Sequence, residues 1–230
     1  MTSYSSIMKK CQLVKTLVCA VLFLGLVSHV QADEKKVKVF ILAGQSNMEG
    51  HGQLRSLNHL GEHPKYGYLL KNIKNEDGSW AVRNDVTVSW KSREKLSGLL
   101  TVGWGFEPHE IGPELMFGTI MGDKYDEPVL LIKTAWGGKD VFCDFRSPSA
   151  GNLTEDEELI LKRDRSINNN RQIGHYYRKM LEDINYTLDN IEDIVPGYKG
   201  QGYEIVGMAW LQGGTILASG TSSWIINLSA

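Results

Sequence analysis

The sequence predicts an α/β protein, a three-layer sandwich with a mainly parallel sheet, on the basis of three observations. Apolar, β-branched runs near residues 37–43, 129–135 and 204–211 have the composition of strands buried inside a parallel sheet. Segments with helical signals separate these runs, and such alternation favours a parallel sheet covered by helices. Each run ends in small or polar residues, at the strand ends where open α/β sheets collect their chemistry.

The first strand ends at Gly44, and Ser46 follows two residues later. At this turn from strand to helix, a serine hydroxyl can face solvent while its own N–H points at a developing anion. The alternative is an ordinary polar turn in which Ser46 or Asn47 caps the helix.

The second strand ends in Trp136-Gly137-Gly138, and the third ends in Trp210-Leu211-Gln212-Gly213. Three strand ends thus deliver a serine, a Gly-Gly turn and a glutamine. A nucleophile, a backbone N–H and a carboxamide donor are the groups needed to hold a tetrahedral oxyanion. Taken singly, Gly137-Gly138 can be a loop exit and Gln212 a strand-end cap.

Residues 50–110 show little periodicity, and we expect long loops and short elements there, over the sheet edge. The histidines in or near this region are interpreted as solvated loop residues, with His109 held in reserve because it precedes the Gly112-Pro113-Glu114 segment; they are His51, His59, His63 and His109.

Three helices are expected in the second half. One begins at Glu114, after Pro113, and turns four apolar residues toward the sheet: Leu115, Met116, Ile120 and Met121. A solvated helix begins within 152–158, with acids in its first turn. The third, Arg171 to Ile194, carries an apolar stripe and ends before Pro196-Gly197; the stripe comprises Ile173, Tyr176, Tyr177, Met180, Leu181, Ile184, Leu188 and Ile191, with His175 one position off it.

These blocks resemble the SGNH hydrolase superfamily, and within it the sialate O-acetylesterase and acetyl xylan esterase branch, carbohydrate esterase family 6. The GQSNM block reads Gly44-Gln45-Ser46-Asn47-Met48, and the WGG and W-x-QG blocks are the strand ends described above. Ile111-Gly112-Pro113-Glu114-Leu115 resembles a GPE segment of the same branch. The resemblance covers about residues 37–213, and it implies an SGNH or flavodoxin-like fold and a serine ester hydrolase that removes O-acetyl groups from sugars.

The resemblance also implies a role for each site residue. Ser46 is the nucleophile, and its N–H forms the oxyanion hole together with a backbone N–H of Gly137 or, in our preference, Gly138, and with the Gln212 amide. Supporting positions are Gln45, Asn47 and Glu114. Glu114 can instead be a first-turn carboxylate favoured by the helix dipole.

One part of the family pattern is missing. The family places its general base on a late Asp-x-x-His motif, and no histidine of this sequence has an aspartate three positions before it, so no catalytic His or Asp is identified. Gly214-Thr215 stand where the family has an acidic or Asn-Asp pair, and no residue from Gly213 to Ala230 is charged. Our hypothesis is a frameshift or premature end that removes the C-terminal part of the sandwich; the alternative is a natural apolar C-terminal strand. A truncated relative would be inactive and would at most bind acetylated glycans.

Residues 1–32 are interpreted as a signal peptide, with a basic start, an apolar segment from Leu17 to Val27 and small residues at Val30-Gln31-Ala32. Residues 33–230 then form one esterase domain, incomplete at the C-terminus, exported to the periplasm or the exterior. The apolar segment is short for a membrane span, and an uncleaved anchor is the alternative.

Composition excludes other function classes. The formal charge of −2 and pI of about 6.3 argue against a nucleic-acid partner. Cys143 is alone after the signal peptide and is expected to be a packed thiol. No metal-ligand spacing appears in the sequence, so no metal or cofactor is expected. The partner that the resemblance implies is an acetylated carbohydrate. Trp104, Phe106 and Trp136 either pack in the core or stack on a sugar ring.

Overall fold

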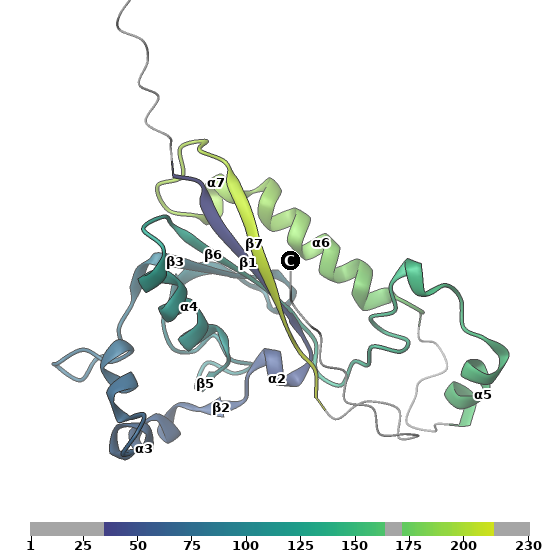
Figure 1. Ribbon diagram of the computed structural model, residues 1–230, viewed down its shortest axis with the longest axis horizontal. Coiled ribbons are helices and arrows are strands. Elements are labelled where there is room, and N and C mark those ends of the chain that lie inside the picture. The colour runs from purple at the N-terminus through teal and green to yellow at the C-terminus, as the bar shows by residue number, and fades with distance from the viewer. Residues whose placement is uncertain (1–34, 164–171, 214–230) are drawn as a thin grey trace, which may run out of the picture. The chain divides into compact units, whose positions relative to one another are not determined.

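The computed structural model describes residues 35–163 and 172–213 (Figure 1). Three expectations fall on residues outside this part: the signal peptide at 1–32, the start of the third helix at Arg171, and the C-terminal tail after Gly213.

A five-stranded sheet in the order β4-β3-β6-β1-β7 forms the centre of the described part. The predicted strands are β1 (Val37–Gly44), β6 (Val129–Ala135) and β7 (Tyr203–Leu211), and they lie side by side. β1 pairs in parallel with both β6 and β7. The predicted mainly parallel α/β sheet is therefore confirmed.

Two further strands occupy the region that we expected to be loops. β3 (Arg83–Trp90) pairs in parallel with β6, and β4 (Lys95–Leu100) pairs antiparallel with β3. The expectation of only loops and short elements at 50–110 was wrong here. The first residues of β3 are polar, and its buried run begins only at Val86, so the apolar signal is short.

Helices cover both faces of the sheet, as Figure 1 shows. The residues of β1 alternate between the faces because successive side chains of a strand point to opposite sides. Val37, Val39, Ile41 and Ala43 pack with α6 (His175–Asp189) and α7 (Ile191–Ile194). Phe40 and Leu42 belong to the opposite cluster, which packs against α4 (Glu114–Lys124).

The helices differ in detail from the prediction. Ile120 of α4 is 50% exposed, and Phe117 packs against the sheet-facing cluster in its place. The predicted long helix is divided at Asn190 into α6 and α7. Within its stripe, Met180 and Ile184 are buried as predicted, whereas Ile173 and Leu181 are exposed. The acidic helix is α5 (Glu155–Arg163), close to where it was predicted.

Most of the shorter elements come between β1 and α4 in the sequence. β2 (Gly52–Gln53) and β5 (Glu110–Ile111) form a two-stranded antiparallel sheet. The remaining short helices are α2 (Ser46–Glu49), η1 (Leu54–Ser56), α3 (Leu57–Glu62), η2 (Gly67–Asn72), η3 (Lys91–Arg93) and η4 (Pro148–Ala150).

The aromatic and sulfur side chains mostly pack as the core alternative predicted. Trp136 and Trp104 pack, partly buried, against the two clusters of the sheet. Cys143 is buried and free, which confirms a packed thiol. Phe106 differs, since its ring centroid lies 3.4 Å from the Arg93 guanidinium carbon and 5.0 Å from the centre of the His51 ring.

Candidate active site

Ser46 lies where the carboxyl ends of three parallel strands meet. β1 ends at Gly44, and Ser46 is the first residue of α2. The N–H of Gln45 donates to the Leu211 carbonyl at the end of β7 (3.1 Å), and the N–H of Trp136 after β6 donates to the Gly44 carbonyl (3.2 Å). The Ser46 residue is half-buried at this edge of the sheet.

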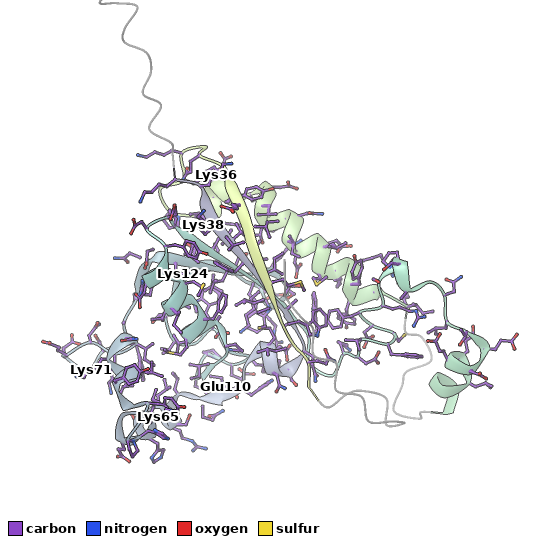
Figure 2. The ribbon with its side chains drawn as sticks, viewed as in Figure 1. Lys36, Lys38, Lys65, Lys71, Glu110 and Lys124 are labelled. Atoms are coloured by element: carbon purple, nitrogen blue, oxygen red, sulfur yellow. The ribbon has the colours of Figure 1, made fainter. Side chains whose placement is uncertain are left out.

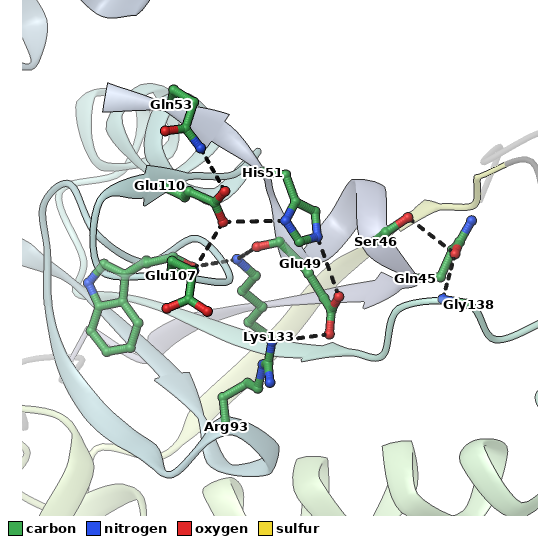
Figure 3. Close-up of polar contacts among 11 residues, drawn as sticks. Gln45, Ser46, Glu49, His51, Gln53, Arg93, Glu107, Glu110, Lys133 and Gly138 are labelled. Carbon is green, nitrogen blue, oxygen red and sulfur yellow. Dashed lines mark hydrogen bonds and ion pairs between the residues drawn. The ribbon is translucent and has the colours of Figure 1, made fainter. Parts of the chain in front are cut away.

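The side chain of Gln45 links the serine to the Gly-Gly turn. Its Oε1 accepts from the Ser46 hydroxyl at 3.2 Å and from the Gly138 N–H at 3.0 Å (Figure 3). Gln45 is itself 2% exposed, and the link is therefore an internal one. Gln45 was predicted as a supporting residue, and the structure shows which two groups it brings together.

Gln212, which follows β7, is hydrogen-bonded both to the Gly-Gly turn region and to Asn47 of α2. The Gln212 amide nitrogen donates to the Lys139 carbonyl at 2.8 Å, which fastens the third block to the Gly-Gly turn. The Asn47 amide donates to the Gln212 carbonyl at 3.1 Å. The structure thus brings together every predicted residue of the three blocks, whose sequence separations exceed 70 residues.

Gly137 stands at a point of close approach between segments. A Cβ at this position would lie 2.7 Å from a carboxylate oxygen of Glu49 and 3.9 Å from the Ser46 Cβ. A side chain here would have to displace the Glu49 carboxylate, which is itself buried. Glycine therefore allows the turn to lie directly against the serine helix.

Glu114, the third supporting residue, is fully buried and forms an ion pair with Lys133 of β6 at 2.7 Å. Its other oxygen accepts from the Gly112 N–H at 2.8 Å. Burial raises the pKa of the Glu114 carboxyl above its ordinary value, and the Lys133 ammonium opposes that rise. Lys133 also donates to the Glu49 carbonyl at the end of α2 (2.8 Å), so Glu114 is linked to the serine helix through Lys133.

The sequence interpretation did not single out Lys133. A charged residue within an otherwise apolar strand is the signal that could have found it, because lysine is almost never fully buried unless it is paired.

His51 is exposed and lies outside the helices and strands, as predicted, but two carboxylates lie beside its imidazole. Its imidazole is about half exposed, but its two nitrogens lie 3.3 Å from Glu110 and 3.7 Å from Glu49 (Figure 3). Glu49 also lies 3.8 Å from Arg93. This cluster is adjacent to α2, and the loop assignment of His51 missed it.

The other histidines of this region, including the reserve candidate His109, are not brought to the serine. His59, His63 and His109 are exposed, as predicted for loop residues. In the part of the chain that the structure describes, the Ser46 hydroxyl donates to Gln45, and no hydrogen bond joins it to a histidine. Within residues 35–163 and 172–213 there is also no cluster of His, Cys, Asp and Glu suited to a metal ion.

No helix among the described residues has the length and apolar character to cross a membrane. The surface lysines labelled in Figure 2 lie apart from the three strand ends, and Lys38 pairs with Glu204 of β7 at 2.6 Å.

Comparison with known proteins finds a solved structure of low sequence identity. A solved X-ray structure of a protein from Arabidopsis thaliana is 16% identical, with 77% of this chain and 58% of that chain covered and a TM-score of 0.39. The chain thus spans little more than half the length of that protein. No curated protein matches the chain.

The model of one protein family matches residues 36–216, a range that contains the whole described sheet and all three blocks. That family is described as carbohydrate esterase, sialic acid-specific acetylesterase. The chain belongs to the sialic acid-specific acetylesterase family of carbohydrate esterases.

Proposed function

We propose that this protein removes O-acetyl groups from sugars, with Ser46 as the nucleophile. The observation that carries the proposal is the meeting of Ser46, the Gly137-Gly138 turn and Gln212 at one edge of the parallel sheet. Family membership supports a carbohydrate ester as the substrate.

In the proposed reaction, the Ser46 oxygen attacks the acetyl carbonyl, and the serine proton passes through water to the sugar oxygen that leaves. The C–O bond to the sugar then breaks, the sugar leaves as an alcohol, and water hydrolyses the acetyl-serine to acetate and free serine. Sialic acid carrying an O-acetyl group is the substrate we favour, because the family is described by that sugar.

The tetrahedral oxyanion needs donors, and the three blocks can supply them. The Ser46 N–H lies in the first turn of α2, where backbone N–H groups have no partner within the helix. The Gln212 amide has two hydrogens, of which one is donated to Lys139. The Gly138 N–H is bonded to Gln45, so in this role the ester oxygen would replace the Gln45 oxygen as its acceptor.

The partner of the serine hydroxyl limits the rate that we expect. Gln45 is a neutral amide, which accepts a hydrogen bond but does not accept a proton near neutral pH. Loss of one triad member typically leaves a rate about 1,000–10,000 times that in water, from the oxyanion hole and substrate binding alone. The described residues therefore support slow, serine-dependent turnover.

The same observation favours a second candidate, a protein that binds acetylated glycans without turning them over. The two candidates differ in one measurement, hydrolysis of para-nitrophenyl acetate and of O-acetylated sialic acid by the full chain. Ser46→Ala should abolish hydrolysis, whereas Ser56→Ala, at an exposed serine of η1, should leave it unchanged. Equal rates for Ser46→Ala and the parent would reject Ser46 as the nucleophile.

A binding measurement distinguishes a protein that binds acetylated glycans from a protein with an unrelated role. Titration of Ser46→Ala with O-acetylated and de-acetylated sialic acid, followed by NMR, should show tighter binding of the acetylated sugar. An inactive parent whose Ser46→Ala variant still prefers the acetylated sugar would support the binding protein instead of the enzyme.

We also infer that the protein is exported through residues 1–32. The basic start, the apolar segment and the small residues at Val30-Gln31-Ala32 support this proposal. Mass spectrometry of the secreted protein should find Asp33 as its first residue, and an intact Met1 would indicate the uncleaved anchor.

A further inference from the structure

Lys133 is a fully buried lysine in the centre of the sheet. It belongs to β6, whose every residue is buried, and its side chain has no exposed surface. Burial of an ammonium group costs several kcal/mol unless partners replace the lost water. The partners of Lys133 therefore indicate what the charge does.

Three oxygens from three separate segments surround the Lys133 ammonium. It donates to the Glu49 carbonyl (2.8 Å), to the Trp104 carbonyl (2.6 Å) and to the Glu114 carboxylate (2.7 Å). Since an ammonium has three hydrogens, these acceptors match its donors. The Trp90 ring lies beside the charge, with its centroid 4.0 Å away.

The Glu49 carbonyl connects Lys133 to the serine. Glu49 is the last residue of α2, and Ser46 is the first. A helix of one turn has little stability of its own, and its last carbonyls have no partner within the helix. A positive charge at this end also complements the helix dipole. Lys133 therefore fixes the C-terminal end of the element that carries Ser46, as the close-up in Figure 3 shows.

Glu114 of α4 completes the set of partners around the Lys133 ammonium. It is the first residue of α4, it is as buried as Lys133, and the Gly112 N–H holds its second oxygen. This carboxylate supplies Lys133 with a buried counter-charge in the core.

We propose that Lys133 is a positioning residue for the nucleophile, which holds α2 through the Glu49 carbonyl, with Glu114 as its counter-ion. The inference rests on the proposed role of Ser46. If the pair only stabilised the core, its removal would change the melting temperature without moving the serine.

The double variant Lys133→Met/Glu114→Gln tests this inference. It removes both charges together and leaves an amide that can still accept from Gly112, so no unpaired charge remains in the core. We expect it to fold, and to lower kcat for para-nitrophenyl acetate about a hundredfold with little change in KM, because small displacements of a reacting group cost that much. An unchanged kcat in the folded variant would overturn the proposal.

Arg83→Met is the matched control. Arg83 pairs with Asp85 of its own strand β3 and joins this strand to α4 through an ion pair with Asp123. Among the described residues, no hydrogen bond or ion pair joins Arg83 to α2. Its loss should lower the melting temperature but leave kcat unchanged. If Lys133→Met/Glu114→Gln does not fold, Lys133→Gln/Glu114→Gln is measured instead with the same expectation, because the glutamine is neutral and too short to replace the lysine at the Glu49 carbonyl.

Hydrogen exchange tests the inference without catalysis. The N–H groups of Met48, Glu49 and Gly50 are bonded within the turn of α2. In the double variant they should exchange about tenfold faster, while those of β1 and β6 keep their protection. If the parent protein is inactive but exchange at α2 is faster in the double variant, the result would support the positioning role of Lys133 and reject the proposed reaction. Unchanged exchange at α2 would reject the positioning role of Lys133.

Discussion

At the scale of single residues, the site depends on a glycine that precedes the serine. Gly44 has a φ of +146°, which side chains of L-residues rarely adopt, and a Cβ there would overlap the Leu211 carbonyl of β7. The tight junction between β1 and β7 is possible because Gly44 has no side chain.

We therefore predict that Gly44→Ala lowers the free energy of unfolding by about 2–4 kcal/mol. Gly207→Ala in β7 is the control, because a Cβ at Gly207 meets nothing within 4 Å. Chemical denaturation of both variants checks the difference, and equal stability of the two would show that the junction tolerates a side chain.

Gln212 carries the second prediction at this scale. If its amide holds the oxyanion, Gln212→Ala should lower kcat/KM for para-nitrophenyl acetate by about a hundred- to a thousandfold. The predicted fall should appear mainly in kcat, since the charge develops only in the transition state. Gln201→Ala, near the opposite end of β7, should have no such effect, and a similar loss there would point to a general loss of structure.

At the scale of elements, α6 contains a carboxylate that the core does not satisfy. Asp183 is buried, and its Oδ2 has no hydrogen-bond partner among the described residues. Burial raises the pKa of Asp183, although the Ser92 hydroxyl and the nearby lysines oppose the rise. A raised pKa in the folded state means that the folded protein binds this proton more strongly, so the contribution to stability is lost as the pH rises through that pKa.

Asp183→Asn removes the charge and should raise the melting temperature at pH 7 by a few degrees. The gain should shrink as the pH falls toward the ordinary aspartate value of 3.8, where Asp183 is itself neutral. Glu182→Gln, on the exposed side of the same helix, should change little. A gain that does not depend on pH would contradict the electrostatic cause.

The elements that could be predicted from sequence are those buried on both faces. β1, β6 and β7 were found because each is a continuous apolar run, whereas β3 begins with polar residues and shows only a short buried segment. The division of the long helix at Asn190 carried no Gly or Pro signal.

The site was predictable to the extent that strand ends meet at one edge. The rule that the carboxyl ends of parallel strands meet at one edge placed Ser46, Gly138 and Gln212 together. It gave no information on the hydrogen bonds that each of these residues forms. Lys133 and His51 were missed because their roles depend on partners up to 84 residues away in the sequence.

At the scale of the whole molecule, the described sheet ends at β7, and this strand exposes several apolar side chains. Tyr203, Ile205, Val206 and Leu211 are each at least 37% exposed. An exposed apolar edge favours pairing between molecules. Ile205→Lys should therefore reduce self-association in light scattering, whereas Val82→Lys, at an exposed valine before β3, should not. Equal association of both variants would exclude the β7 edge as its cause.

The central claim is that Ser46 accepts the acetyl group, and peptide mass spectrometry tests it most directly. The full chain is mixed with para-nitrophenyl acetate, quenched and digested. Because para-nitrophenol is a good leaving group, acetylation of Ser46 should be faster than attack by water on the acetyl-serine, and the intermediate should accumulate. The account predicts one acetyl group on the peptide that contains Ser46, and none on that peptide in Ser46→Ala. An unmodified Ser46 peptide in a chain that still hydrolyses the ester would contradict it.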